Sequence, residues 1–292
     1  MPNFPGPLKN LNVITEDGQI HSLMGTALHF VYLDGAGMAP IRRILEKAPL
    51  QHGASDRGFR LDPRSMILHL YIEGTDERHA DGLRDRIAYL FGPTNSPLQL
   101  RATRDDGAVR QIDCYVDGEV DFPMSQRVGN GQPVVIPLLA PDPIWYDPVQ
   151  QVTEHTITNG TTQKFVSVSG LTWDDWPVID LTGPMDAGFL LQHTPGDEVL
   201  VFSQAIPSGE TFRLDLRPGY KSIQRTSDNA NRMSFIDPNY LHAFADMRIL
   251  AEKTTRATHP LFTNTNVFTF DAAGTSGASK ATIYWYKRYL SL

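Results

Sequence analysis

The stretch Ala140–Pro148, A-P-D-P-I-W-Y-D-P, divides the chain and decides how the fold is organised. Its three prolines each remove a backbone donor and push the preceding residue toward extended geometry, so no helix or inner strand can run through it. Strand-like patterns lie on both sides, which indicates two domains, residues 1–148 and 149–292. Because large rings seldom remain exposed beside a rigid turn, we expect Trp145 and Tyr146 to be at least half buried between the two domains.

Length and composition are those of an ordinary globular chain. The 292 residues are 41% hydrophobic and 20% charged, and the net charge is −7 at pH 7. Proteins bind the phosphates of nucleic acids mainly through lysine and arginine side chains, so an acidic chain is a poor candidate for a nucleic-acid-binding protein. The lone cysteine, Cys114, excludes an intrachain disulfide and a CxxC motif and is best taken as a small buried hydrophobe. No signal-peptide or membrane-span pattern is visible, so we expect a soluble chain without membrane insertion.

Antiparallel sheet is the expected architecture of the first domain. Asp-Gly and Asn-Gly dipeptides recur between alternating apolar segments, which is typical of hairpins. Residues 66–72 are apolar on both faces, so we expect a central strand there. Residues 132–140 alternate like a strand, and residues 98–103, 109–116 and 119–124 predict a meander joined by Asp-Gly turns.

A single α-helix is predicted at about residues 75–91. Thr75 is placed to cap its N-terminus, apolar residues recur at helical spacing, and Gly92 and Pro93 end it. Gly82 weakens this helix by roughly 1 kcal/mol relative to alanine, a cost that packing of the apolar stripe can exceed.

The conformation of residues 40–48 is left open by their pattern. The apolar positions suit a short helix, but the location between Gly37 and Pro49 also suits a strand or an extended arm. We favour the extended form.

The second domain is β by pattern throughout. Segments of strand length alternate with turn residues at the spacing of a β-sandwich. The expected strands are Val166–Ser169, Val178–Leu181, Gly188–His193, Val199–Ser203, Glu210–Leu216, Met233–Ile236, Asn266–Asp271 and Ala281–Tyr289. Residues 243–253 suit either an amphipathic turn or another strand. The predicted fold class is therefore mainly β, with two β-sandwich domains and one α-helix in the first.

The motifs of common enzyme classes are absent from the sequence. There is no GxSxG, HExxH, GxxxxGK[ST] or GxGxxG, and Gly35–Gly37 is better explained by a turn than by a phosphate cradle. The nine histidines form no pair at metal-binding spacing. The loop Asp228–Asn231 departs from a calcium loop at its sixth and twelfth positions, so a hairpin tip is the better interpretation. We expect no catalytic residue, no cofactor and no metal.

Two groups of residues have a functional interpretation beside a structural one. Asp174 and Asp175 lie between Trp173 and Trp176, and tryptophans can stack on sugar rings. The strand Tyr284–Tyr289 is another candidate sugar platform. Tryptophans in a polar connection more often fill a domain junction, and adjacent acids in such a connection are seldom a tuned glycosidase pair.

Four acidic residues are predicted to share one face of a hairpin pair at residues 109–124. They are Asp113, Asp117, Glu119 and Asp121, which alternate along the strands so that all point to the same side. We therefore expect this face to be exposed to solvent.

Several stretches, taken in their order along the chain, carry a resemblance to a known family. They are Gly35–Pro49, Gln51–Gly53, Asp56–Gly58, Leu61–Arg64, Arg84–Asp85, Pro141–Pro143 with Trp145–Tyr146, Trp176–Pro177, Gly183–Pro184, Ile206–Glu210 with Leu214–Asp215, and Tyr284–Tyr289. In these stretches the chain resembles the distal tail protein family of phages with long non-contractile tails. The likeness spans nearly the whole sequence.

The resemblance implies a structural hub without chemistry of its own. It implies an N-terminal domain with one helix and a protruding hairpin that closes into a homo-hexameric ring, and a peripheral C-terminal domain that is galectin-like or jelly-roll-like. The ring would sit at the tail tip of the virion. It would join the tail tube protein to tail-tip proteins, tail fibres or receptor-binding proteins, with the tape measure protein as a further partner.

A ring also constrains the surfaces of each subunit. Head-to-tail closure needs two different complementary surfaces on each subunit. The strand at 66–72, which is apolar on both faces, and the extended segment at residues 40–48 before it are together a candidate for one of them. DNA would pass through the lumen without specific binding, so we expect an acidic channel lining to which the 109–124 hairpin contributes. The alternative function is that of a stand-alone carbohydrate-binding β-sandwich protein.

Overall fold

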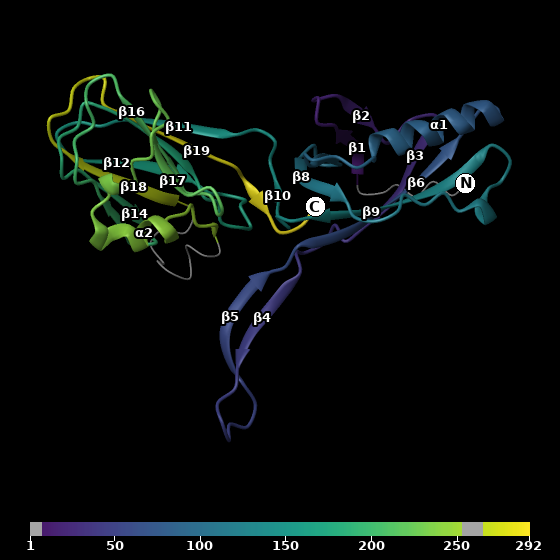
Figure 1. Ribbon diagram of the computed structural model, residues 1–292, viewed down its shortest axis with the longest axis horizontal. Coiled ribbons are helices and arrows are strands. Elements are labelled where there is room, and N and C mark those ends of the chain that lie inside the picture. Colours follow the sequence, from purple (N-terminus) through teal and green to yellow (C-terminus); the bar gives the residue numbers. More distant parts are fainter. Residues whose placement is uncertain (1–7, 253–264) are drawn as a thin grey trace. The chain divides into compact units, whose positions relative to one another are not determined.

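The computed structural model describes residues 8–252 and 265–292, which are mainly β, as the sequence predicts (Figure 1). They fall into two compact units. The first unit ends at Pro148 and also contains Tyr289–Leu292, and the second is Val149–Arg288.

The last four residues differ from the expected range 149–292 of the second domain. They lie with the first unit, where the Leu292 N–H donates to the Ala36 carbonyl oxygen at 3.0 Å. This contact joins positions far apart in the sequence, so no local sequence pattern predicts it.

One antiparallel sheet of nine strands forms most of the first unit. Its spatial order is β2-β1-β7-β8-β9-β6-β3, and β10 pairs with both β8 and β20 beside this path. The strands are β1 (Leu8–Ile14), β2 (Ile20–Ser22), β3 (Leu28–Asp34), β6 (Arg64–Glu73), β7 (Leu98–Arg104), β8 (Val109–Val116), β9 (Gly131–Ala140), β10 (Trp145–Tyr146) and β20 (Arg288–Tyr289).

The helix α1 (Glu77–Leu90) packs its apolar stripe on the same core as β6. The buried stripe consists of Ala80, Leu83, Ile87 and Leu90, as the helical spacing predicts. The N-cap is Asp76 instead of Thr75, because the Asp76 carboxylate accepts from the His79 N–H at 2.8 Å. The Thr75 N–H instead donates to the His79 ring at 3.1 Å.

Two strand predictions in the first domain have different outcomes. The strand at 132–140 is confirmed as β9, with alternating buried positions. The strand at 119–124 is wrong: only Asp121 forms a bridge, with Val135, and the chain then enters the short 3-10 helix η1 (Met124–Gln126). Pro123 lacks the backbone donor that further pairing with β9 would need.

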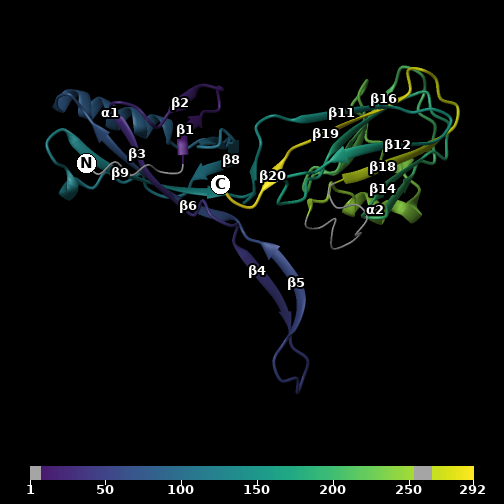
Figure 2. The same ribbon diagram turned by 180° about the vertical axis from the view of Figure 1, so that it is seen from behind.

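A two-stranded hairpin extends from the sheet of the first unit (Figures 1 and 2). It is built from β4 (Ile41–Glu46) and β5 (Ser55–Leu61), which pair only with each other in the described part of the chain. Every residue of β4 is exposed. The extended conformation favoured for residues 40–48 is confirmed. We call residues 38–63 the arm.

The second unit consists of two sheets with one hydrophobic core. The first has the order β11 (Gln151–Thr156), β19 (Lys280–Trp285), β13 (Val178–Thr182), β16 (Thr211–Asp215) and β17 (Ser222–Arg225). The second has the order β12 (Gly160–Ser167), β18 (Thr265–Ala272), β14 (Leu190–Thr194) and β15 (Glu198–Val201). This arrangement is consistent with a β-sandwich.

Some expectations for the second unit need correction. Met233–Ile236 is not a strand but contains the 3-10 helix η2 (Met233–Phe235). The segment after it forms η3 (Pro238–Tyr240) and the short helix α2 (Leu241–Asp246), so the alternative of a strand at 243–253 is wrong over its described part. The pattern also missed β11 and β17. None of the helices in the described residues has the length and apolarity that spanning a membrane takes.

Replacing Gly82 with alanine is expected to raise the free energy of unfolding of the first unit by about 1 kcal/mol. Gly82 lies on the exposed side of α1, where a Cβ meets no atom within 4 Å. Chemical denaturation, followed by protection of β6 and β9 amides from hydrogen exchange, measures the change. The matched control is Gly74→Ala, whose Cβ would lie 2.6 Å from the Ala80 nitrogen and should destabilise the unit. A loss of stability in Gly82→Ala would contradict the prediction.

Candidate assembly interface

The root of the arm is held by one buried cation, Arg64, whose side chain is 1% exposed. Its guanidinium donates to the carbonyl oxygens of Gly35 at 2.7 Å, Gly37 at 2.6 Å, Pro143 at 2.8 Å and Leu290 at 2.8 Å. Burial lowers the pKa of Arg64 to about 10, which leaves it charged at neutral pH. One side chain therefore ties together the start of the arm, the proline-rich junction and the C-terminal tail.

The glycine pair at the arm root forms a turn, as predicted. Gly35 has φ 77°, and a Cβ there would lie 2.3 Å from the Ser65 carbonyl oxygen, so only glycine fits. The carbonyl oxygens of Gly35 and Gly37 point at a guanidinium, whereas a phosphate cradle presents backbone N–H groups to its anion.

The C-terminal tail, residues 289–292, lies along the arm root. The Ala39 N–H donates to Leu290 at 3.1 Å, and the Leu292 N–H donates to Ala36 at 3.0 Å. The guanidinium carbon of Arg110 lies over the ring of Tyr289, 4.2 Å from the ring centroid. The orientation of the arm at its root is thus fixed by backbone and cation contacts.

The free part of the arm carries apolar side chains that are exposed to solvent. They are Ile41, Ile44, Leu45, Leu50 and Phe59. Leu50, at the tip, is 100% exposed and has φ 65°, a conformation that is costly for a leucine. Strain of this kind at an exposed apolar residue is typical of a binding surface. Between the strands, Arg43 pairs with Asp56 at 2.9 Å, so the charges of the arm are partly matched internally.

The outward side of β3, β6 and β9 is a second candidate surface. On β6 the residues Met66, Leu68, Leu70 and Ile72 are buried, and the alternate residues face away from that core. By register, this outer face contains His29, Tyr32, Asp34, Ser65, Ile67, His69, Tyr71, Pro133, Val135, Pro137 and Leu139. Most of these residues are apolar or aromatic, so the expectation of an internal strand with apolar residues on both sides is confirmed.

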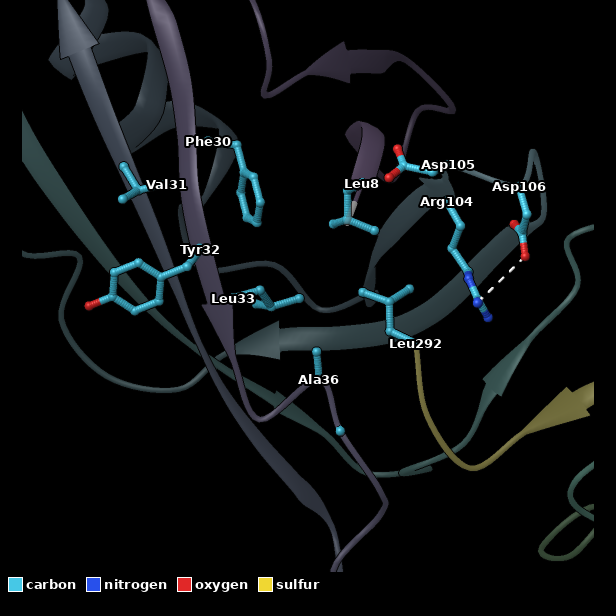
Figure 3. A pocket seen from close by; sticks show the side chains of 11 residues that line it. Leu8, Phe30, Val31, Tyr32, Leu33, Ala36, Arg104, Asp105, Asp106 and Leu292 are labelled. Atoms are coloured by element: carbon cyan, nitrogen blue, oxygen red, sulfur yellow. Dashed lines mark ion pairs between the residues drawn. The ribbon is translucent and has the colours of Figure 1, made fainter. Parts of the chain in front are cut away.

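A groove with a volume of about 560 Å³ lies between β3 and the beginning of β1 (Figure 3). Phe30 and Leu33 of β3 face Leu8 and Leu292 across it. The turn between β7 and β8 forms its polar rim with Arg104, Asp105 and Asp106. Arg104 pairs with Asp106 at 3.5 Å.

The expected acidic face is only partly correct. Asp117, Glu119 and Asp121 are exposed, but Asp113 is half buried and accepts from the Tyr146 hydroxyl at 2.5 Å. Burial raises the pKa of the Asp113 carboxyl above its ordinary value. The contact to Tyr146 joins β8 to β10, which the parity of β8 cannot reveal.

The two rings of the proline-rich stretch belong to the first unit. Trp145 is fully buried in the core that also contains Leu98 and Ile112, instead of filling a space between two domains. Tyr146 accepts from the Gln111 side chain at 2.8 Å. β10 pairs with both β8 and β20 and is therefore a strand of the first sheet, so the expectation that no inner strand runs through the proline-rich stretch is wrong. The two residues of β10 lie between Pro143 and Pro148, are free of proline and can pair.

The paired acids of the second unit hold its loops in place. Asp174 pairs with Arg248 at 3.2 Å, and Asp175 accepts from the Tyr286 N–H at 2.7 Å and pairs with Arg288 at 3.4 Å. Asp175 is 5% exposed, and burial raises its pKa to about 6. Each carboxylate has its own arginine, which is the arrangement of structural ion pairs.

The candidate sugar platform is not an open aromatic surface. Trp176 packs against the core of the second unit and has Arg248 6.0 Å from its ring. Trp173 is half buried and its backbone forms a bridge with Arg288. Asp228–Asn231 lies in a turn, as predicted, and the described residues contain no group of three or more metal-ligating side chains suited to an ion.

Residues 34–132 match the family model of the phage tail protein RIFT-related domain. This range contains the arm, Arg64, α1 and the strands between them. This part of the chain is similar to a phage tail domain, in agreement with the resemblance to phage tail proteins.

Solved structures extend the comparison to the whole fold. The Dit protein of phage SPP1, described as a hub of the adsorption apparatus of phages that infect Gram-positive hosts, matches with a TM-score of 0.63 at 15% identity, covering 96% of this chain and 99% of that chain. A chain of the phage p2 baseplate, activated with calcium, gives a TM-score of 0.49 at 9% identity, covering 97% and 99%. The comparison with curated proteins found no match.

Arg64→Met is expected to lower the free energy of unfolding of the first unit by about 2–4 kcal/mol, because buried carbonyl oxygens lose their charged donor. Hydrogen exchange should rise at the Ala39 and Leu292 amides, which lie beside the lost contacts. Arg64→Lys is the control for charge, and it should rescue only partly because an ammonium cannot reproduce the planar fork. A Met variant with wild-type exchange at both amides would contradict the proposed anchoring.

Asp175 is expected to make the second unit less stable as the pH rises. Its folded pKa of about 6 lies above the ordinary value of 3.8, so its contribution is fully present below about pH 4 and is lost as the pH rises through 6. The free energy of unfolding should fall over that range by something on the order of 2–3 kcal/mol. Asp175→Asn should remove this part of the pH slope, even though its overall stability is lower.

Tryptophan fluorescence is a suitable signal, because three of the four tryptophans lie in the second unit. Denaturant titrations at intervals between pH 4 and pH 7 give the slope for each protein. Equal slopes for wild type and Asp175→Asn would show that this carboxyl does not titrate with a raised pKa.

Proposed function

We propose that this protein is a distal tail hub of a long non-contractile phage tail. The observation that supports the proposal best is the fold, which over nearly the whole chain is that of a protein described as a tail adsorption hub. The family match over residues 34–132 agrees with it. The protein is a structural component of the virion at the tail tip, and it acts by assembly instead of catalysis.

The hub is a homo-hexameric ring closed by the first unit, taken as residues 1–148. A ring requires two different complementary surfaces on each subunit. The arm is exposed, and the outer face of β3, β6 and β9 is exposed or half buried and mostly apolar, so the subunit has two different surfaces of the kind required. Tail tube protein binds one side of the ring, and tail-tip proteins, tail fibres or receptor-binding proteins bind the other. The tape measure protein is a further partner.

The second domain, taken as residues 149–292, is a peripheral galectin-like module. Two sheets with one core support this assignment, and its paired acids and half-buried tryptophans favour a scaffold over a sugar-binding role.

DNA passes through the ring without specific binding. The exposed acids Asp117, Glu119 and Asp121 suit a channel wall that repels phosphate, since basic residues repeated around a ring would retain DNA.

The purified protein is expected to assemble into closed six-membered rings at modest concentration. Sedimentation velocity gives the mass, and electron microscopy gives the symmetry. Leu45→Asp in the arm should shift the protein toward monomer, because a charge would replace an exposed apolar contact. Tyr89→Asp is the control, since this residue is also exposed but lies on α1. A wild-type protein that stays monomeric alone and with tail tube protein would contradict the proposed function.

A further inference from the structure

Side chains join the edge strand β3 to its neighbour β6 in addition to the backbone. Among the residues that the structure describes, β3 pairs with β6 alone, and a bulge between Phe30 and Tyr32 interrupts the ladder between them. A bulge leaves one residue unpaired and disrupts the hydrogen bonds around it. An edge strand with such a ladder therefore depends more on cross-strand side-chain contacts than an inner strand does.

Two histidine–carboxylate pairs cross between these strands on the outer face, one toward each end of β3. The Nε2 atom of His29, on β3, lies 3.3 Å from a carboxylate oxygen of Glu73, on β6. The Nε2 atom of His69, on β6, lies 3.6 Å from a carboxylate oxygen of Asp34, on β3. The arrangement is reciprocal, because each strand supplies one imidazole and one carboxylate.

The structure fixes both imidazoles. The ring of His69 stacks on Tyr32, with the ring centroids 4.0 Å apart and the planes at 21°. The Nε2 atom of His29 is shielded from solvent and has no hydrogen-bond partner among the described residues, so the Glu73 carboxylate is the counterion within its reach. Both carboxylates are more than half exposed, which keeps the strength of each pair modest.

Few other titratable groups face the two pairs. On β3, β6 and β9 the remaining titratable residues of the outer face are Tyr32 and Tyr71, and the others are serine, proline or aliphatic residues. Beyond β9, Asp121 forms a bridge with Val135 and adds a further acid on the same side. The charges that these strands bring to the two imidazoles are therefore negative.

Protonation changes what the pairs do. Imidazole side chains ordinarily change charge between about pH 5 and pH 8. A protonated imidazole forms an ion pair with the carboxylate opposite it, and opposite charges across two strands stabilise their pairing. A neutral imidazole leaves that carboxylate without a counterion. β3 ends at Asp34, and the next residue is Gly35 at the arm root, so one of the pairs acts where the arm begins.

We propose that the two pairs form a proton-dependent clamp, in which protonation of His29 and His69 fastens β3 to β6. The clamp holds the strand that leads into the arm more firmly in mildly acidic conditions than in mildly alkaline ones. It concerns the fold of one subunit, so it is tested separately from the proposed function.

Hydrogen exchange of the wild-type protein at pH 6 and pH 8 tests the clamp. Protection factors, which correct for the intrinsic effect of pH on exchange, should be about three to ten times higher at pH 6 for the β3 amides bonded to β6. That range is what two partly exposed ion pairs contribute together. The amides of β7, an inner strand of the same sheet between β1 and β8, are the reference and should change less.

Two variants separate the pairs from other effects of pH. Glu73→Gln combined with Asp34→Asn keeps both histidines but removes the charges that they meet, so β3 protection should be equal at the two pH values. His52→Gln is the matched control, since this histidine is exposed in the arm outside both pairs, and it should retain the wild-type difference. Circular dichroism checks that both proteins are folded.

Three results would overturn the clamp. The first is a wild-type protein in which β3 and β7 respond equally to pH. The second is a pH effect on β3 that persists in the Glu73→Gln, Asp34→Asn variant, because protonation would then act through other groups. The third is loss of the effect in His52→Gln. None of these results bears on ring assembly, which has its own measurement.

Discussion

The geometry of the first unit depends on the burial of one guanidinium. Taking a charge out of water is expensive, and Arg64 recovers the cost only because four carbonyl oxygens surround it. Those acceptors come from the arm root, the proline-rich junction and the tail, so the three segments must all be in place for any one contact to be favourable. Turn geometry at Gly35 brings two of the acceptors into reach, and the rigid backbone near Pro143 presents the third.

The elements that the sequence predicted correctly are those specified by short-range patterns. The apolar stripe of α1 and the alternation of β9 each lie within one segment, and helical or strand periodicity is sufficient to find them. The predicted N-cap differs by one residue because both Thr75 and Asp76 are good capping residues, and the choice depends on which side chain reaches the His79 N–H.

The elements that were missed are those decided by distant partners. The acceptors of Arg64 are separated from it by up to 226 residues in the sequence. An arginine at the start of a strand does not indicate which distant carbonyl oxygens it will bind. Asp113 has the parity of a solvated acid, yet Tyr146 covers it. The strand expected at 119–124 has turn and alternation signals, but only Asp121 pairs with β9, and the chain enters η1 after Pro123. The candidate interface was predicted in its parts, the arm and the two-sided strand, but the groove depends on how the ends of the sheet approach each other.

A rigid root and an uncovered arm are two parts of one physical requirement. An isolated two-stranded hairpin is at best marginally stable in water, so an arm that must find a partner surface gains from being anchored at its base. Anchoring by Arg64 and the tail removes conformational freedom before association, which lowers the entropy that binding must otherwise overcome. The free end, with the strained and fully exposed Leu50, keeps its apolar surface for the partner. Exposed strands of this kind can pair non-specifically with strands of other chains. The charges of the arm, among them the cross-strand pair Arg43–Asp56, disfavour such pairing and favour association with a surface of complementary charge.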